Sequence, residues 1–137
     1  MTKQYHIILP QYSRGVHLIT SHITDLLKGE LPTNGMLNIF IQHTSAGLTI
    51  NENADPSVRV DFDMFFRKLV PENTEYFTHN YEGSDDMPAH ILASIFGCSL
   101  NIPIINNNLG LGIWQGIYLG EFRNMGGKRS IVLTITS

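Results

Sequence analysis

The chain contains little cysteine and no long hydrophobic run. Its 137 residues include a single cysteine, which excludes an intramolecular disulfide and fits a reducing compartment. No apolar run approaches the roughly 20 residues needed to span a bilayer, and the first residues lack a signal-peptide pattern. We therefore predict a soluble, cytoplasmic protein that has no membrane partner.

Positive charge is also scarce. Charged residues make up 15% of the chain, and the formal net charge is −3. The only basic cluster is the short stretch of Arg123, Lys128 and Arg129. Proteins that bind nucleic acid normally carry a basic patch, so we predict no nucleic-acid partner.

The chain does have enough apolar residues for one hydrophobic core. It is 42% hydrophobic, and 137 residues is the usual length of one domain. No internal repeat, linker or low-complexity tract interrupts the sequence. We predict a single domain over residues 1–137.

Local patterns predict strands near both ends of the chain and helices between them. β-rich or alternating runs predict strands over residues 3–9, 36–42, 47–50, 99–105, 111–122 and 129–136. Apolar periodicity with Pro or Gly at the ends predicts helices over residues 21–28, 56–69 and 86–96.

The order of these elements predicts the fold class. No helix separates the final strands, so we predict an α+β fold with a mostly antiparallel sheet or sandwich and two or three helices. We expect the strand at 47–50 to pair with the one at 36–42. The turn RNMGGK, residues 123–128, is expected to close a hairpin between the last two strands.

The stretch HNYEGSDDMPAH, residues 79–90, concentrates potential metal ligands and contains no Lys or Arg. Asp86 and His90 are four residues apart on the predicted helix, so they share one face, and His79 and Glu82 precede the helix. Two imidazoles and a carboxylate are a common ligand set for Zn²⁺ that leaves one position open. Alternatively, the acidic residues cap the helix and the histidines are structural. The stretch leaves both interpretations open.

A second polar stretch, QHTSAGLTINENADPS, covers residues 42–57. His43 stands where a strand gives way to small residues, and there the backbone can approach a ligand. Glu52 and Asp55 follow on a polar loop before the second helix, whose N-terminal amides can hold an anion. The alternative is that Asp55 and its neighbours only form a turn and a helix cap. If His43 faces the pocket of the other two histidines, a three-histidine site results.

Four residues in the last third of the chain need a separate interpretation. Three of them have a structural and a functional interpretation, and the fourth has only a structural one. Trp114 is expected to pack in the core or in an interface, with stacking on a heterocycle as the alternative. Arg123 and Arg129 flank the last predicted turn and can bind phosphate, with a solvated turn as the alternative. Cys98 is predicted to be a small buried apolar residue.

Three motifs together resemble the YjbQ family, the secondary thiamine-phosphate synthase group. The motifs are HTSAGLTINENADPSV (43–58), HNYEGSDDMPAH (79–90) and SLNIPIINNNLGLGIWQGIYLGEFR (99–123). They occur in the family's order, and the resemblance extends over essentially the whole chain. It implies a small α+β fold that assembles as a homotrimer, with a histidine cluster that suits a metal near the subunit boundaries.

The resemblance also implies which residues form the site. The metal ligands would be His43, His79 and His90. The acidic and basic residues that match the family's motifs are Glu52, Asp55, Glu82, Asp85, Asp86, Glu121 and Arg123. The sequence departs from the family at two positions, where Asn107 and Ile113 replace the usual Gly and Thr.

The activity associated with the family couples hydroxymethylpyrimidine diphosphate to a thiazole phosphate, giving thiamine phosphate and pyrophosphate. The leaving pyrophosphate must be neutralised by a divalent ion or by cationic side chains. We therefore expect a small phosphorylated substrate and a divalent metal, zinc by its ligands with magnesium as the alternative. The expected catalytic residues are Glu82, Asp86, Glu52 and Arg123.

Two other functions remain open. The same ligands would serve a zinc-dependent hydrolase of unknown substrate. They would also serve a non-catalytic trimer that binds a metal or a small anion.

Overall fold

The computed structural model describes residues 1–137 and has eight strands and three helices. The strands are β1 (Thr2–Leu9), β2 (Gly15–Leu18), β3 (Asn34–Ile41), β4 (Ala46–Glu52), β5 (Ser99–Ile105), β6 (Asn108–Leu109), β7 (Gln115–Glu121) and β8 (Arg129–Thr136). The helices are α1 (Thr20–Leu26), α2 (Ser57–Leu69) and α3 (Asp86–Phe96). The predicted helices and the α+β class are confirmed.

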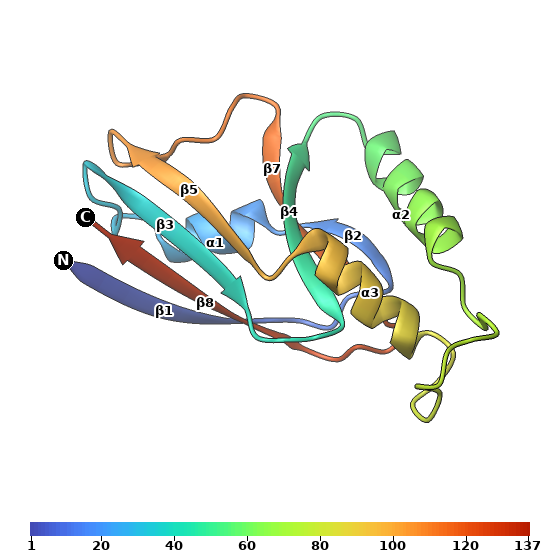
Figure 1. The fold of residues 1–137 in the computed structure, drawn as a ribbon. Helices are drawn as coiled ribbons and strands as arrows, with labels where there is room; N and C mark the ends of the chain where they lie inside the picture. Colours follow the sequence, from blue (N-terminus) through green and yellow to red (C-terminus); the bar gives the residue numbers. More distant parts are fainter.

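The strands form two antiparallel sheets that share one apolar core. The larger sheet has the order β1-β8-β3-β5-β6, and the smaller one has the order β2-β7-β4. Figure 1 shows the larger sheet on one side of the molecule, and α2 and α3 beyond the smaller sheet. Ile39 and Leu133 from the larger sheet meet Leu48 and Leu119 from the smaller one in the core.

Two strand pairings expected from the sequence are wrong. β4 pairs with β7, with Ala46 opposite Glu121, and does not pair with β3. β7 and β8 lie in different sheets, so the turn between them is not a hairpin. A turn motif shows that the chain reverses direction, but it does not determine which strand becomes the hydrogen-bonded neighbour. At 42–45 and again at 122–128 the chain crosses between the sheets instead.

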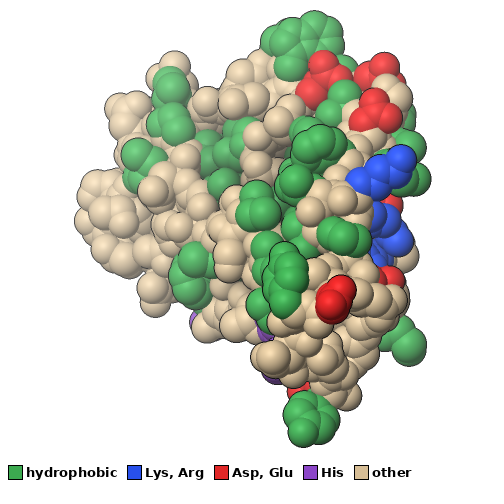
Figure 2. Space-filling view, turned by 45° about the vertical axis from the view of Figure 1, so that its right-hand side comes forward, with side chains coloured by type: hydrophobic (Ala, Val, Ile, Leu, Met, Phe, Trp, Pro, Cys, Tyr) green, Lys and Arg blue, Asp and Glu red, His purple; other side chains and the backbone are tan.

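α3 packs closely on β4, whereas α2 is poorly covered. A Cβ on Gly47 of β4 would lie 2.7 Å from the Cβ of Phe96, so glycine allows this close approach. No residue of α2 is buried, and Phe65 and Leu69 are 60% and 52% exposed. Figure 2, which brings this side of the molecule forward, shows many apolar side chains at the surface. None of the helices has the length and apolar character that a membrane span requires.

Two residues that were predicted to be buried are exposed. Trp114 is 63% exposed, and Cys98 is also exposed, so core packing is wrong for both, and packing of Trp114 in an interface stays a prediction. The reason for Trp114 is that β7 begins only at Gln115, and the preceding residues form a turn at the surface. Cys98 follows the end of α3 at Gly97, where the chain turns with a φ of 98°.

Candidate metal centre

The carboxylate of Asp86, at the first residue of α3, is the centre of a polar cluster. The residue is 1% exposed, and its Oδ1 accepts a hydrogen bond of 2.7 Å from Nη1 of Arg123. Its Oδ2 lies 2.8 Å from Nε2 of His79 and 3.3 Å from Nε2 of His90. One buried carboxylate therefore contacts a guanidinium through one oxygen and two imidazoles through the other.

His79, Asp86 and His90 each offer one potential ligand atom to a common point. The three atoms all lie within 4.8 Å of one another. In a tetrahedral zinc site with bonds of about 2.0 Å, neighbouring ligand atoms lie about 3.3 Å apart. The distance between the Asp86 and His90 atoms, 3.3 Å, already has this length, and that between the Asp86 and His79 atoms is 2.8 Å. The donor atoms therefore fit a metal ion.

The ring of His90 is oriented by a backbone carbonyl. Its Nδ1 lies 2.8 Å from the carbonyl oxygen of Thr44. A carbonyl oxygen can only accept, so Nδ1 carries the proton and Nε2 of the neutral ring keeps its lone pair. In imidazoles that bind metals, one ring nitrogen commonly donates to such a carbonyl and the other binds the ion, and Nε2 of His90 lies 3.3 Å from Oδ2 of Asp86.

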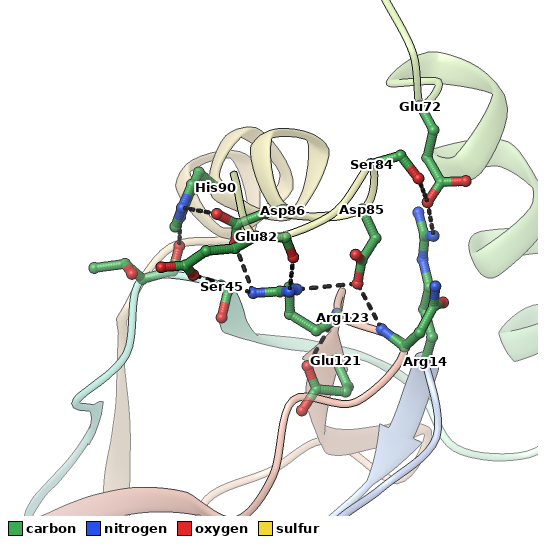
Figure 3. A network of polar contacts seen from close by, with 12 residues as sticks. Arg14, Ser45, Glu72, Glu82, Ser84, Asp85, Asp86, His90, Glu121 and Arg123 are labelled. Carbon is green, nitrogen blue, oxygen red and sulfur yellow. Dashed lines mark hydrogen bonds and ion pairs between the residues drawn. The ribbon is translucent and has the colours of Figure 1, made fainter. Parts of the chain in front are cut away.

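Arg123 holds the acidic loop around the start of α3 (Figure 3). Its guanidinium donates to Oδ2 of Asp85 at 3.0 Å, to Asp86, and to the carbonyl oxygen of Glu82 at 2.7 Å. Gly83, with a φ of 109°, adopts a backbone conformation that favours glycine and lets the chain turn sharply before the helix. Asp85 is the N-cap residue of α3 and Asp86 lies in its first turn, but neither makes a side-chain capping hydrogen bond, and both carboxylates bind Arg123 instead. That the histidines have only a structural role stays the alternative.

Asp85 is stabilised in its charged form. Burial raises the pKa of this carboxyl, but hydrogen bonds from the backbone N–H of Asn124, at 2.8 Å, and from Arg123 outweigh burial. The pKa of Asp85 therefore lies below its ordinary value. The fold stabilises the carboxylate that holds the loop.

A second, buried ion pair supports the loop that orients His90. Arg129 is 3% exposed and donates to both carboxylate oxygens of Glu121, at 2.7 and 2.6 Å. Its Nη2 also donates to Oγ of Ser45 at 3.0 Å. Since Ser45 follows Thr44, this pair fixes the crossover loop whose carbonyl oxygen accepts from His90.

His43 lies outside the group of three ligand atoms. Its Nε2 accepts a hydrogen bond of 2.8 Å from the backbone N–H of Ser130. Burial and the nearby charge of Arg129 lower the pKa of His43, and Glu121 partly opposes them. The ring is therefore a neutral acceptor in the fold. That His43 is a third histidine ligand stays a prediction.

A cavity of about 450 Å³ lies beside the cluster. It is lined by His43, Thr44, Ala46, His90, Ala93, Ser94, Gly97 and Cys98. His90 therefore belongs both to the cluster and to the cavity wall. The wall contains no Lys or Arg, so it offers an anionic ligand no fixed positive charge.

Glu52 lies away from the cluster, whereas Arg123 is part of it and Arg129 lies in the neighbouring ion pair. Glu52 is at the far end of β4, in a separate depression with Trp114. Arg123 and Arg129, considered above as phosphate ligands, are both engaged with carboxylates.

The family model described as UPF0047 protein YjbQ-like matches residues 5–137. The chain belongs to this family. It is 51% identical to the UPF0047 protein YjbQ of Salmonella typhimurium and 47% identical to that of Escherichia coli O157:H7, in both cases over 98% of each chain. The resemblance to the YjbQ family is thereby confirmed.

Solved structures agree with this assignment. A YjbQ/UPF0047 family protein of Clostridium acetobutylicum superposes with a TM-score of 0.85 at 35% identity, covering 96% of this chain and 99% of that one. A hypothetical protein of Aeropyrum pernix K1 gives a TM-score of 0.87 at 26% identity, covering 98% of both chains. These family names state no reaction, so the activity has to be argued from the site.

Several residues that shape the site were missed from the sequence. The carbonyl of Thr44 is a backbone group, so the residue type does not reveal its role. The Glu121–Arg129 pair forms only because the chain crosses between the sheets at 122–128. Gly126 closes over this pair, since a Cβ there would lie 2.5 Å from Nη2 of Arg129. Glycines in the turn RNMGGK are the only visible hint, and they indicate a turn rather than a buried ion pair.

Replacing Asp85 with Asn tests the clamp formed by Arg123. We expect a loss of about 1–3 kcal/mol in the free energy of unfolding near neutral pH, because a charged acceptor is removed. A carboxyl with a lowered folded-state pKa stabilises the fold above its ordinary pKa, about 3.9, and this stabilisation is lost as the pH falls further. Urea titrations near neutral pH and at about pH 3 should show the difference between wild type and variant shrinking in acid.

The matched control is Asp61→Asn, at an exposed α2 position without a side-chain partner. It should be neutral at both pH values. An equally large loss for Asp85→Asn at both pH values would contradict the electrostatic account.

Proposed function

We propose that His79, Asp86 and His90 bind a divalent metal ion and that the metal serves catalysis in the adjacent cavity. The observation that carries this is the convergence of two Nε2 atoms on Oδ2 of Asp86. Mixed imidazole and carboxylate donors suit Zn²⁺ better than Mg²⁺, which prefers oxygen. Three protein ligands leave a position open, as is typical of catalytic zinc sites.

Hydrolysis is the reaction that this site supports best. When bound, a divalent ion activates water near neutral pH and stabilises developing negative charge. The side chain of Glu82 is 69% exposed, and its one ion-pair partner, Nη1 of Arg123, lies 3.9 Å away, so no short hydrogen bond holds this carboxylate in place. Asp86, predicted above as catalytic, is assigned to the metal, and Glu82 is assigned as the general base.

The alternative is a transfer reaction that forms thiamine phosphate and releases pyrophosphate. The activity implied by the motif resemblance motivates it, and a metal ion held by these residues would also neutralise a leaving pyrophosphate. The cationic side chains weigh against it. Arg129 is buried in its ion pair and Arg123 already donates to three acceptors, so the metal would have to carry the whole neutralisation.

The metal site is tested by replacing its histidines one at a time. We expect His79→Ala and His90→Ala each to lower zinc affinity at least about 100-fold, because each removes a ligand. Zinc titration of chelator-treated protein by calorimetry measures the affinity. His6→Ala is the control, since His6 is exposed on β1 and should leave the affinity unchanged. If both site variants bind zinc as wild type does, the proposed site is wrong.

The two reactions are distinguished with zinc-loaded protein. Hydrolysis predicts turnover of activated phosphate or carboxylate esters without a second substrate, and Glu82→Gln should lower kcat about 10²- to 10⁴-fold at unchanged zinc content. Transfer predicts thiamine phosphate only when hydroxymethylpyrimidine diphosphate and thiazole phosphate are both present. Thiamine phosphate formation without ester turnover would replace the hydrolase proposal, and no turnover in either assay would remove both.

We also propose that the protein assembles as a homotrimer. The exposed apolar side chains of α2 support a partner surface, because isolated soluble chains rarely expose large apolar patches. Light scattering after size exclusion should give a mass three times that of the 15.4 kDa chain. A monomer at micromolar concentration would rule the trimer out.

A further inference from the structure

A second depression lies at the end of β4 that is distant from the metal centre. It has a volume of about 390 Å³ and is lined by Ile50, Asn51, Glu52, Trp114 and Gln115. The cavity beside the metal centre contacts β4 at Ala46, so the two hollows are separated by nearly the whole strand. We propose that this Trp114 depression binds the amino-substituted base of an unphosphorylated nucleoside.

The indole of Trp114 provides an aromatic platform. Its residue is 63% exposed, and no side-chain hydrogen bond engages its ring nitrogen. A bare indole at the wall of a hollow is available for stacking with a flat ring, which is how proteins commonly bind nucleobases.

The lining of the depression contains one acceptor group and two donor groups. Oδ1 of Asn51 accepts from the Glu52 N–H at 2.7 Å, and Oε1 of Gln115 accepts from the Gly112 N–H at 2.7 Å. Each amide therefore has its NH₂ group left to donate. The Glu52 carboxylate has neither a hydrogen bond nor an ion pair, so it is an unused acceptor.

An amino-substituted base presents the complementary set of atoms. Its exocyclic amine donates to a carboxylate, and its neighbouring ring nitrogen accepts from an amide NH₂. Glu52 would receive the amine, while Gln115 or Asn51 would donate to the ring nitrogen. A base with a carbonyl in place of the amine would set two acceptors against each other.

The depression is held in shape without a ligand. The Tyr118 hydroxyl donates to the carbonyl oxygen of Glu52, and the Asn53 N–H donates to that of Trp114 at 2.6 Å. Glu52 and Gln115 are direct partners in the register of β4 and β7. A rigid backbone under unpaired polar groups favours binding, because little order has to be gained when the ligand enters.

Charge restricts the ligand to one without phosphate. The lining contains no Lys or Arg, and the only charged group in it is the Glu52 carboxylate. A phosphate next to it would be repelled and would find no cation. The ligand of this depression is therefore different from any phosphorylated substrate of the metal centre. Binding in the depression does not depend on a bound metal ion.

Fluorescence tests the proposal directly, because Trp114 is the only tryptophan in the chain. Metal-free protein is titrated with adenosine and cytidine, with excitation at the red edge of the indole band, where nucleosides do not absorb. We expect saturable quenching by at least one of them. The matching nucleosides without the amine, inosine and uridine, should bind at least about tenfold more weakly, and the 5′-monophosphates more weakly than the nucleosides.

Glu52→Gln identifies the group that recognises the amine. This substitution should lower the affinity for the aminated nucleoside at least about tenfold and leave the affinity for the matching nucleoside without the amine nearly unchanged. Glu75→Gln, at an exposed position without side-chain contacts, is the matched control and should bind as wild type does. The proposal is overturned if neither adenosine nor cytidine quenches saturably, or if the amine makes no difference. It is also overturned if Glu52→Gln has no effect, or if acrylamide cannot reach Trp114 in the intact assembly.

Discussion

The buried carboxylate of Asp86 is the constraint on which the site depends. A charge taken out of water costs several kcal/mol unless partners replace the water, and here each oxygen has partners of a different kind. Arg123 neutralises one side and ties the acidic loop to the start of α3. The two imidazoles contact the other side, where a cation would complete the charge balance.

The sandwich supplies the rest of the geometry through two of the passages that the chain makes between its sheets. The chain passes between the sheets after β3 and again after β7, and the buried Glu121–Arg129 pair fastens these passages to each other through Ser45. The loop that is held in this way offers the Thr44 carbonyl to His90. The orientation of an imidazole on α3 therefore follows from the packing of two sheets, which is why a small fold can hold a metal-binding group rigidly.

Local features of the site could be predicted from the sequence, and long-range ones could not. Pro88 in the first turn and Gly97 after the last residue indicate the third helix, and the four-residue step from Asp86 to His90 places both on one face. In contrast, no pattern in the stretch 79–90 reveals that Arg123, far along the chain, binds its carboxylates instead of the helix amides. The pairing of β4 with β7 was missed for the same reason, since it depends on the path of the chain between two sheets. Core packing of Trp114 was wrong because its apolar character was weighed without the surface turn that precedes β7.

The central claim is that Asp86 divides its oxygens between Arg123 and a metal ion shared with His79 and His90. Anomalous diffraction from crystals grown with zinc tests it most directly. The account predicts one strong peak about 2.0–2.2 Å from Nε2 of His79, Nε2 of His90 and Oδ2 of Asp86, with Oδ1 still bound to Arg123. A zinc ion bound to other side chains, or no peak at saturating zinc, would contradict it.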